Sequence, residues 1–316
     1  MSRGQSQPTQ DRRGAGLQPC EAGFAALKAL RHLQSVVLVL VVSASLAFAQ
    51  APPRPKRIVS LVPAATEMIY AMGDGARVAA VSTYDHFPAD VAGLPKVGGL
   101  LDPSVERVLA IRPDLVVVYA TQKDLIERLA RAGIPTFTYE HRGLADIMTT
   151  MRAIGARIGS AARADAVASG MERSLAEIRG RTAGLPHPAT LLVFERDPAS
   201  LRNVYASGGY GFLHDMLEIA GGRNVFAEVK QQAVQASTEM LLTSKADVIV
   251  ELLYGDSLKN ADIPKVLRAW DALASVPAVR THRVSALTGD EFVVPGPRVV
   301  DATRQLARAI HPDVFK

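Results

Sequence analysis

One cassette of helix and strand occurs twice in the chain, and this duplication restricts the possible folds more than any other feature. The stretch PSVERVLAIRPDLVVV recurs 133 residues later, without a gap, as ASTEMLLTSKADVIVE. Each copy has a serine that can cap a helix, Ser104 or Ser237, and a glutamate in the first helical turn, Glu106 or Glu239. Because both copies then enter an apolar strand, the pattern predicts two related α/β halves.

Length and charge are typical of a two-domain globular protein. The chain has 316 residues, of which 48% are hydrophobic, which is enough for two cores. Its net charge is +5, but residues 1–49 carry +3 of this, and no basic tract follows them. We therefore expect no nucleic-acid partner.

The front of the chain is typical of an export signal. In the segment LRHLQSVVLVLVVSASLAFAQ, an apolar run from Val36 to Leu46 follows basic residues and precedes the small residues Ala47-Phe48-Ala49. This predicts a signal peptide with an upstream extension over residues 1–49, cleaved after Ala49. A membrane span is the alternative, but the run is shorter than the roughly 20 residues that a bilayer needs. The single cysteine, Cys20, would be removed with the signal, which excludes disulfides in the mature protein.

After Arg57, short β-rich runs alternate with helical stretches, which predicts parallel βαβ units. From Leu144 to Ile178 the apolar residues follow helical spacing and are interrupted by Gly159-Ser160, which predicts two successive helices. The expected domains are an N-terminal α/β lobe over 57–160, a linking helix over 161–183 and a C-terminal α/β lobe over 184–316.

Five motifs, in order between Arg57 and Phe315, carry a resemblance to a known family. They are RIVSLVPAATEMIYAMG, STYDHFP, PKVGGLLDPSVERVLAIRPDLV, ASGGYGFLHDMLEIAGGRNVF and PGPRVVDA. Together they resemble the helix-linked periplasmic substrate-binding proteins of ABC importers for cobalamin, ferric siderophores and haem, and most closely the cobalamin branch. The resemblance implies two Rossmann-like lobes joined by one long helix, with the ligand in the cleft between them. It also implies a periplasmic, non-enzymatic receptor without a cofactor of its own, whose ligand is a cobalt- or iron-containing small molecule.

The same resemblance gives the duplicated glutamates a role. In such proteins one glutamate on each lobe inserts into a basic pocket on one of the importer's two transmembrane subunits. Glu106 and Glu239 occupy the matching positions, so they are the expected docking residues. A duplicated charge suits a twofold partner.

Ligands of open α/β sheets bind beyond the carboxyl ends of the strands, so the residues that follow each strand are the binding candidates. Aromatic residues and glycines recur there, which suits a large, partly flat ligand. The candidates are Pro63, Tyr84, His86, Gly99, Leu100, Tyr119, Arg196, Tyr210, Tyr254, Asp290 and Phe292.

Some candidates have a more specific expected role. The resemblance places Tyr84 and Asp290 at positions that contact corrinoid, and His86 or Tyr84 is a possible iron or cobalt ligand. An ordinary hydrogen-bonded histidine is the alternative for His86. Arg196 is expected to pair with ligand oxygens or else to be plain solvated surface.

The chain departs from the cobalamin branch at one feature. That branch has a tryptophan six residues before each docking glutamate, but this chain has Leu100 and Ala233 there. The departure leaves a siderophore or haem as the alternative cargo.

Two functions of other classes remain as rivals. Tyr84-Asp85-His86 facing Asp290 across a cleft resembles an acid–base site, but the sequence has no nucleophile elbow, no phosphate loop and no HExxH. A zinc or manganese receptor would need several histidines and carboxylates in the cleft, and none follows the first strand. Turnover of a chromogenic ester would indicate the hydrolase, and a calorimetric metal titration would indicate the metal receptor.

Overall fold

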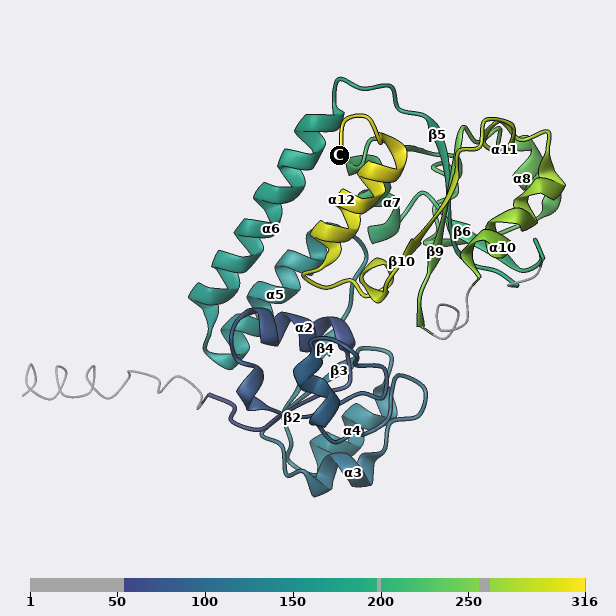
Figure 1. Ribbon diagram of the computed structural model, residues 1–316. Helices are drawn as coiled ribbons and strands as arrows, with labels where there is room; N and C mark the ends of the chain where they lie inside the picture. The colour runs from purple at the N-terminus through teal and green to yellow at the C-terminus, as the bar shows by residue number, and fades with distance from the viewer. Residues whose placement is uncertain (1–53, 198–199, 256–261, 316) are drawn as a thin grey trace, which may run out of the picture. The chain divides into compact units, whose positions relative to one another are not determined.

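The structure is a computed structural model that describes residues 54–197, 200–255 and 262–315 (Figure 1). The predicted signal peptide lies outside the described residues. None of the helices within those residues is long and apolar enough to cross a membrane.

The N-terminal lobe is built on a four-stranded parallel sheet in the order β2-β1-β3-β4. Its elements are β1 (Ile58–Ser60), α2 (Pro63–Ala71), η1 (Gly75–Arg77), β2 (Val78–Val81), η2 (Ala89–Gly93), α3 (Val105–Ala110), β3 (Leu115–Tyr119), α4 (Lys123–Arg131) and β4 (Thr136–Tyr139). Helices pack on this sheet, which explains why its central strands read as continuous apolar runs. The residues from Leu115 to Val118 in β3 are fully buried.

The C-terminal lobe is built on a second, mixed sheet in the order β10-β9-β5-β6-β8, with β7 beside β5. Its elements are β5 (Ala189–Glu195), β6 (Val204–Ser207), α7 (Phe212–Ile219), β7 (Arg223–Asn224), β8 (Ala233–Ala236), α8 (Thr238–Thr243), β9 (Val248–Leu253), α10 (Ile263–Arg268), η3 (Ala269–Leu273), α11 (Pro277–Arg280), β10 (Val284–Thr288), η4 (Asp290–Phe292) and α12 (Val299–Ile310). Strands β10, β9 and β5 are parallel, but β6 is antiparallel to both β5 and β8. The predicted parallel pattern therefore holds for only part of this sheet.

Two helices connect the sheets: α5 (Leu144–Ile158) and the longer α6 (Ala161–Thr182). The chain turns between them at Gly159, which has φ of 75°, a conformation that favours glycine. In Figure 1 the two helices lie side by side, with α6 on the outside. The two-lobed α/β fold with a long connecting helix confirms the predicted fold class, whereas the predicted domain boundaries stay predictions.

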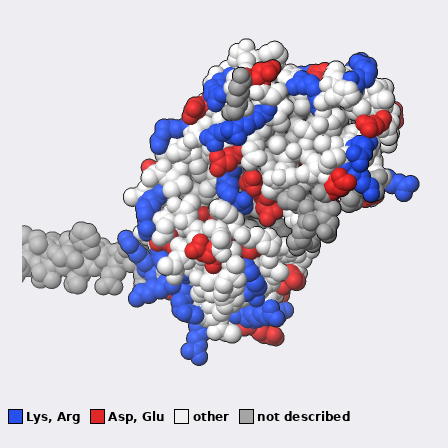
Figure 2. Space-filling view, viewed as in Figure 1, with Lys and Arg blue, Asp and Glu red and all other residues white. Residues whose placement is uncertain are grey.

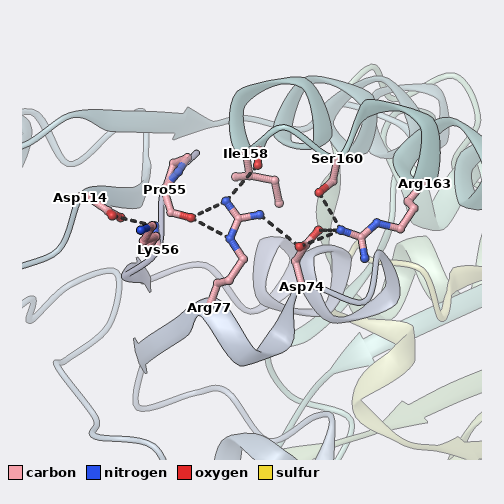
Figure 3. A network of polar contacts seen from close by, with 8 residues as sticks. All are labelled: Pro55, Lys56, Asp74, Arg77, Asp114, Ile158, Ser160 and Arg163. Atoms are coloured by element: carbon pink, nitrogen blue, oxygen red, sulfur yellow. Dashed lines mark hydrogen bonds and ion pairs between the residues drawn. The ribbon is translucent and has the colours of Figure 1, made fainter. Parts of the chain in front are cut away.

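A network of polar contacts fastens the start of α6 to the N-terminal lobe (Figure 3). Both carboxylate oxygens of Asp74 accept hydrogen bonds from Arg163 Nη2, at 2.9 and 3.0 Å, and Oδ1 also accepts from Arg77 Nη1 at 3.1 Å. Arg77 also donates to the carbonyl oxygens of Pro55 and Ile158, so it joins the first described residues to the end of α5. Burial opposes ionisation of Asp74, but hydrogen bonds from Ser160 and Arg77, together with the charges of Arg163 and Arg77, outweigh it and lower its pKa.

The duplicated cassettes have the same local structure in both lobes. Helices α3 and α8 each have six residues, and Arg107 N and Met240 N donate to the capping side chains of Ser104 and Ser237. Each cassette continues into a fully paired strand of its own lobe's sheet, β3 or β9. The cassette is thus the same structural unit in both lobes.

The chain between helix and strand is also equivalent in the two copies. Arg112 and Lys245 both have positive φ, at 53° and 47°. Asp114 and Asp247 then accept backbone hydrogen bonds from the starts of β1 and β5, since Arg57 N donates to Asp114 at 2.9 Å and Ala189 N to Asp247 at 3.0 Å. The duplication seen in the sequence is therefore a structural repeat.

Candidate ligand cleft and docking surface

The C-terminal lobe contributes an aromatic pocket to the cleft. This aromatic pocket has a volume of about 310 Å³ and is lined by Phe194, Tyr210, Gly211, Phe212, Leu213, Gln232, Ala233, Tyr254 and Val293. Phe194 is near the end of β5 and Tyr254 directly follows β9, at the carboxyl edge of these two parallel strands, where ligands bind in this class of fold. Burial raises the pKa of Tyr254, with a further contribution from Glu195, so its hydroxyl stays neutral and can donate a hydrogen bond.

The N-terminal lobe contributes a polar pocket. This polar pocket has a volume of about 470 Å³ and is lined by Tyr119, Ala120, Thr121, Lys123, Tyr139, Glu140, His141 and Arg142. Burial, with a contribution from Asp85, raises the pKa of Tyr119 to about 12. Lys123 and Arg142 are exposed, so two cationic side chains stand at the wall of this pocket.

The two pockets meet at a pair of aromatic rings from different lobes. The rings of His141 and Phe212 are 5.8 Å apart in an edge-to-face arrangement, and His141 also packs against Tyr139 at 5.6 Å. Burial lowers the pKa of His141, so its ring is neutral at pH 7. Because His141 lines the polar pocket and Phe212 the aromatic pocket, the two pockets adjoin at this contact.

A partly buried ion pair joins the two lobes. Arg298, directly before α12, binds Glu67 of α2 at 2.5 and 3.1 Å and Glu291 at 3.2 Å. Its guanidinium carbon lies 4.3 Å from the centre of the Phe87 ring. Burial raises the pKa of Glu67, although Arg298 opposes the change. The contact fixes the lobes against each other with charge-assisted hydrogen bonds.

Asp85 is a second buried carboxyl group in the N-terminal lobe. It is 2% exposed, and its Oδ2 accepts a hydrogen bond from Ser82 N at 2.9 Å. Its Oδ1 is buried without a hydrogen-bond partner among the described residues. Burial raises its pKa, and hydrogen bonds from Thr66 and Ser82 only partly offset this.

The structure brings some of the predicted binding residues together. Tyr210 and Tyr254 line the aromatic pocket, and Tyr119 lines the polar pocket. Asp290 lies beside Tyr254, because its Oδ1 accepts a hydrogen bond from Gly255 N at 3.1 Å. These four remain good candidates for ligand contact.

Other predicted residues lie outside both pockets. Tyr84 is 60% exposed, and a side chain at Gly99 would collide with its ring, so the glycine lets the ring lie on the backbone. His86 is exposed, Leu100 is 40% exposed, and Pro63 begins α2. Their part in ligand binding stays a prediction.

Two predicted binding residues are corrected, because their side chains face the protein interior. Phe292 has no exposed surface and belongs to the main hydrophobic core. The side chain of Arg196 is 2% exposed and pairs with Glu251 at 2.9 Å, and Glu251 also accepts a hydrogen bond from Trp270 Nε1 at 2.9 Å. Neither side chain is available to a ligand in this structure, although each follows a strand.

Several cleft residues were missed by the sequence reasoning. Phe194, Phe212 and Gln232 line the aromatic pocket and Lys123 lines the polar pocket. Phe212 lies two residues after the predicted candidate Tyr210, and this proximity is the signal that could have found it.

The docking candidates are exposed on equivalent helices. Glu106 is in the first turn of α3, and Glu239 is in the first turn of α8. Over the described part of the chain, neither carboxylate forms an ion pair. On the face of the molecule seen in Figure 2, both acidic and basic side chains are exposed. The two carboxylates are therefore accessible to a cationic partner.

The described residues contain no group of three or more His, Cys, Asp or Glu side chains that could hold a metal ion. The paired aromatic and polar pockets are suited instead to a larger molecule with both flat and charged parts.

Comparison with known proteins gives consistent matches. The chain matches the family described as periplasmic binding protein over residues 58–291. It is 30% identical to the ABC transporter substrate-binding lipoprotein YvrC of Bacillus subtilis, over 83% of this chain and 82% of the relative. It is 28% identical to the vitamin B12-binding protein of Yersinia pseudotuberculosis, over 87% and 92%. The crystal structure of the periplasmic heme-binding protein RhuT from Roseiflexus sp. RS-1 shares the fold, with a TM-score of 0.70, 24% identity and coverage of 83% and 99%.

Proposed function

The chain belongs to the periplasmic binding protein family, and we propose that its cleft captures a metal-tetrapyrrole or an iron chelate for delivery to a membrane permease. It is the substrate-binding component of an ABC transporter. Proteins of this family bind and deliver ligands outside the cytoplasm, and we assign no catalytic role to the cleft. Removal of a signal peptide after Ala49 is part of the proposal.

One observation supports this ligand class above the others: the aromatic and polar pockets meet at the His141–Phe212 contact. A planar macrocycle would bury its face against rings such as Tyr210 and Phe212, which stack well on flat apolar surface. Its polar edge would extend toward Lys123 and Arg142. A bare metal ion requires neither a flat aromatic surface nor nearby cationic side chains.

A corrinoid is the first candidate, and haem or a ferric siderophore is the alternative. The relative from Yersinia pseudotuberculosis binds vitamin B12, while the structural neighbour from Roseiflexus binds haem. The cleft of this chain has Ala233 where the cobalamin branch has a tryptophan, and Ala233 lines the aromatic pocket. A small residue at that point leaves room for a ligand whose shape differs from that of cobalamin.

The ligand is tested by absorption spectroscopy. The purified mature protein is mixed with cyanocobalamin, haemin or a ferric hydroxamate, and free ligand is removed by gel filtration. Co-elution of the corrin spectrum would establish a corrinoid receptor, and retention of only haemin or hydroxamate would establish the alternative. Retention of none of the three would contradict the proposed ligand class.

We also propose that Glu106 and Glu239 dock the receptor on two transmembrane subunits. Both carboxylates are exposed on equivalent helices, and such charges steer and orient association with a complementary surface. Glu106→Ala together with Glu239→Ala should abolish uptake of the retained ligand while the gel-filtration result is unchanged. Loss of ligand retention would instead place the glutamates in ligand binding and contradict the docking role. Glu172→Ala on α6, outside both cassettes, serves as the control.

A further inference from the structure

The cassettes share an exposed leucine as well as a glutamate. Leu109 and Leu242 occupy the same position in the two copies, three residues after Glu106 and Glu239. They are 38% and 41% exposed, so the two copies match in exposure as well as in position. Two unrelated surface leucines would have no reason to match in both position and exposure.

Helical geometry places each leucine beside its glutamate. Side chains three residues apart in an α-helix are neighbours on one face. In α3 this joins Glu106 to Leu109, and in α8 it joins Glu239 to Leu242. Each short helix therefore presents a carboxylate next to an apolar side chain, and we call these two surfaces the docking patches.

Packing of α3 and α8 on their sheets does not depend on these leucines. In α3 the buried residue is Val108, and in α8 it is Leu241, each one position before the exposed leucine. Packing of the helix on its sheet is thus provided by a neighbouring residue. A single exposed leucine is ordinary, but its repetition on both lobes indicates a shared partner.

We propose that Leu109 and Leu242 bind, together with the adjacent glutamates, to two equivalent transmembrane subunits of the importer. Each subunit would offer a cationic side chain for the carboxylate and an apolar depression for the leucine. This inference rests on the proposed docking of the glutamates. It extends that proposal because the carboxylate supplies orientation, whereas burial of the leucine supplies binding free energy.

The experiment measures binding of the fluorescently labelled mature receptor to membrane vesicles from cells that carry its own transporter. Vesicles from cells without the transporter give the background. Each substitution of Leu109→Ser or Leu242→Ser should weaken binding roughly tenfold, and the double variant more than either alone. Val314→Ser is the matched control, because Val314 is 39% exposed and lies outside both docking patches. It should leave binding unchanged.

The outcomes separate this inference from the docking proposal on which it rests. If Glu106→Ala with Glu239→Ala abolishes binding but the leucine variants bind normally, the glutamates dock and the leucines do not. If neither pair of substitutions changes binding, the docking proposal itself is wrong. Thermal unfolding of each variant checks the fold, and the exposed positions should leave the melting temperature unchanged. Equal losses at Leu109 and Leu242 would support two equivalent subunits.

Discussion

The two lobes match closely on one surface and differ in the cleft. Helices α3 and α8 agree in capping serine, first-turn glutamate and exposed leucine, and the second residue after each helix has positive φ. In the cleft, however, the C-terminal lobe presents aromatic rings and the N-terminal lobe presents charged and hydroxyl groups. A twofold partner requires two equal surfaces, whereas an asymmetric ligand requires two unequal ones. Under the proposed roles, the matched surfaces serve the transporter and the unequal pockets serve the ligand.

The interiors of the halves also differ at one matched position. Val118 in β3 corresponds to Glu251 in β9 at the cassette offset, so one lobe buries an apolar side chain where the other buries a carboxylate. In the C-terminal lobe this carboxylate is paired with Arg196 and Trp270. Mutation of Arg196 and Glu251 tests how much this ion pair contributes to stability.

The largest expected effect is on this buried pair. Arg196→Ala should lower the free energy of unfolding by about 3–5 kcal/mol, because Glu251 would remain buried without its cation. Urea unfolding of the mature protein measures the change. Arg196→Met combined with Glu251→Val, the latter copying Val118 of the N-terminal lobe, should cost less than Arg196→Ala alone, since both charges are removed together. A double variant less stable than Arg196→Ala would contradict this account.

The next effect is on the aromatic half of the cleft. Phe212→Ala removes a wall of the aromatic pocket and the contact with His141, so it should weaken binding of the retained ligand roughly tenfold or more. Absorption titration measures the affinity.

A separate effect is expected in the polar half of the cleft. If haemin is the retained ligand, replacing Lys123 and Arg142 by alanine should weaken binding of haemin but leave binding of its dimethyl ester unchanged. An equal loss for both compounds would show that the polar pocket does not recognise carboxylates.

Replacing Asp85 in the N-terminal lobe is expected to increase stability rather than lower it. Burial raises the pKa of its carboxyl group; Lys96 partly opposes this, but no described residue forms an ion pair with Asp85 as Arg196 does with Glu251. The folded state therefore takes up a proton more readily than the unfolded state, and this group adds stability as pH falls from 7 through its raised pKa. Asp85→Asn should raise the melting temperature at pH 7 and flatten its dependence on pH below that. If the melting temperature of Asp85→Asn depends on pH as it does in the unsubstituted protein, Asp85 is not the group responsible for that dependence.

Much of the fold could be predicted from the sequence because its signals are local. The alternation of strands and helices, the break at Gly159-Ser160 and the serine caps each depend on residues close together in the chain. The antiparallel pairing of β6 was not predicted, because short strands carry no signal for the direction of their neighbours. The sequence shows where the fold repeats better than it shows how the repeats differ.

The candidate site was predicted less completely, for a related reason. Strand ends identify loops but not the direction in which each side chain points, so Phe292 and Arg196 were expected in the cleft although both face inward. The contact of His141 with Phe212 joins residues from different lobes and has no local signature. Tyr210 and Tyr254 were found because they follow strands and also point into the pocket.

Smaller effects are expected at the helix caps that the lobes share. Ser104→Ala and Ser237→Ala each remove a hydrogen bond to the third residue of a six-residue helix, at 3.3 and 3.2 Å. Each should lower the free energy of unfolding by about 1 kcal/mol, and the two losses should be similar. Replacement by aspartate, which also caps helices, is the control and should preserve stability. Markedly unequal losses in chemical denaturation would show that the two helices are alike only in shape.

The smallest effect is expected where each helix ends. Arg112 and Lys245 hold left-handed backbone conformations, which cost a residue with a side chain about 1–2 kcal/mol, and glycine adopts them freely. Part of this gain is lost because glycine is more flexible in the unfolded chain, so Arg112→Gly and Lys245→Gly should each stabilise the protein by up to about 1 kcal/mol. His282, with φ of 56°, lies outside the cassettes and should respond in the same way. If His282→Gly stabilises the protein but the two cassette variants do not, then Arg112 and Lys245 make contacts that offset the strain.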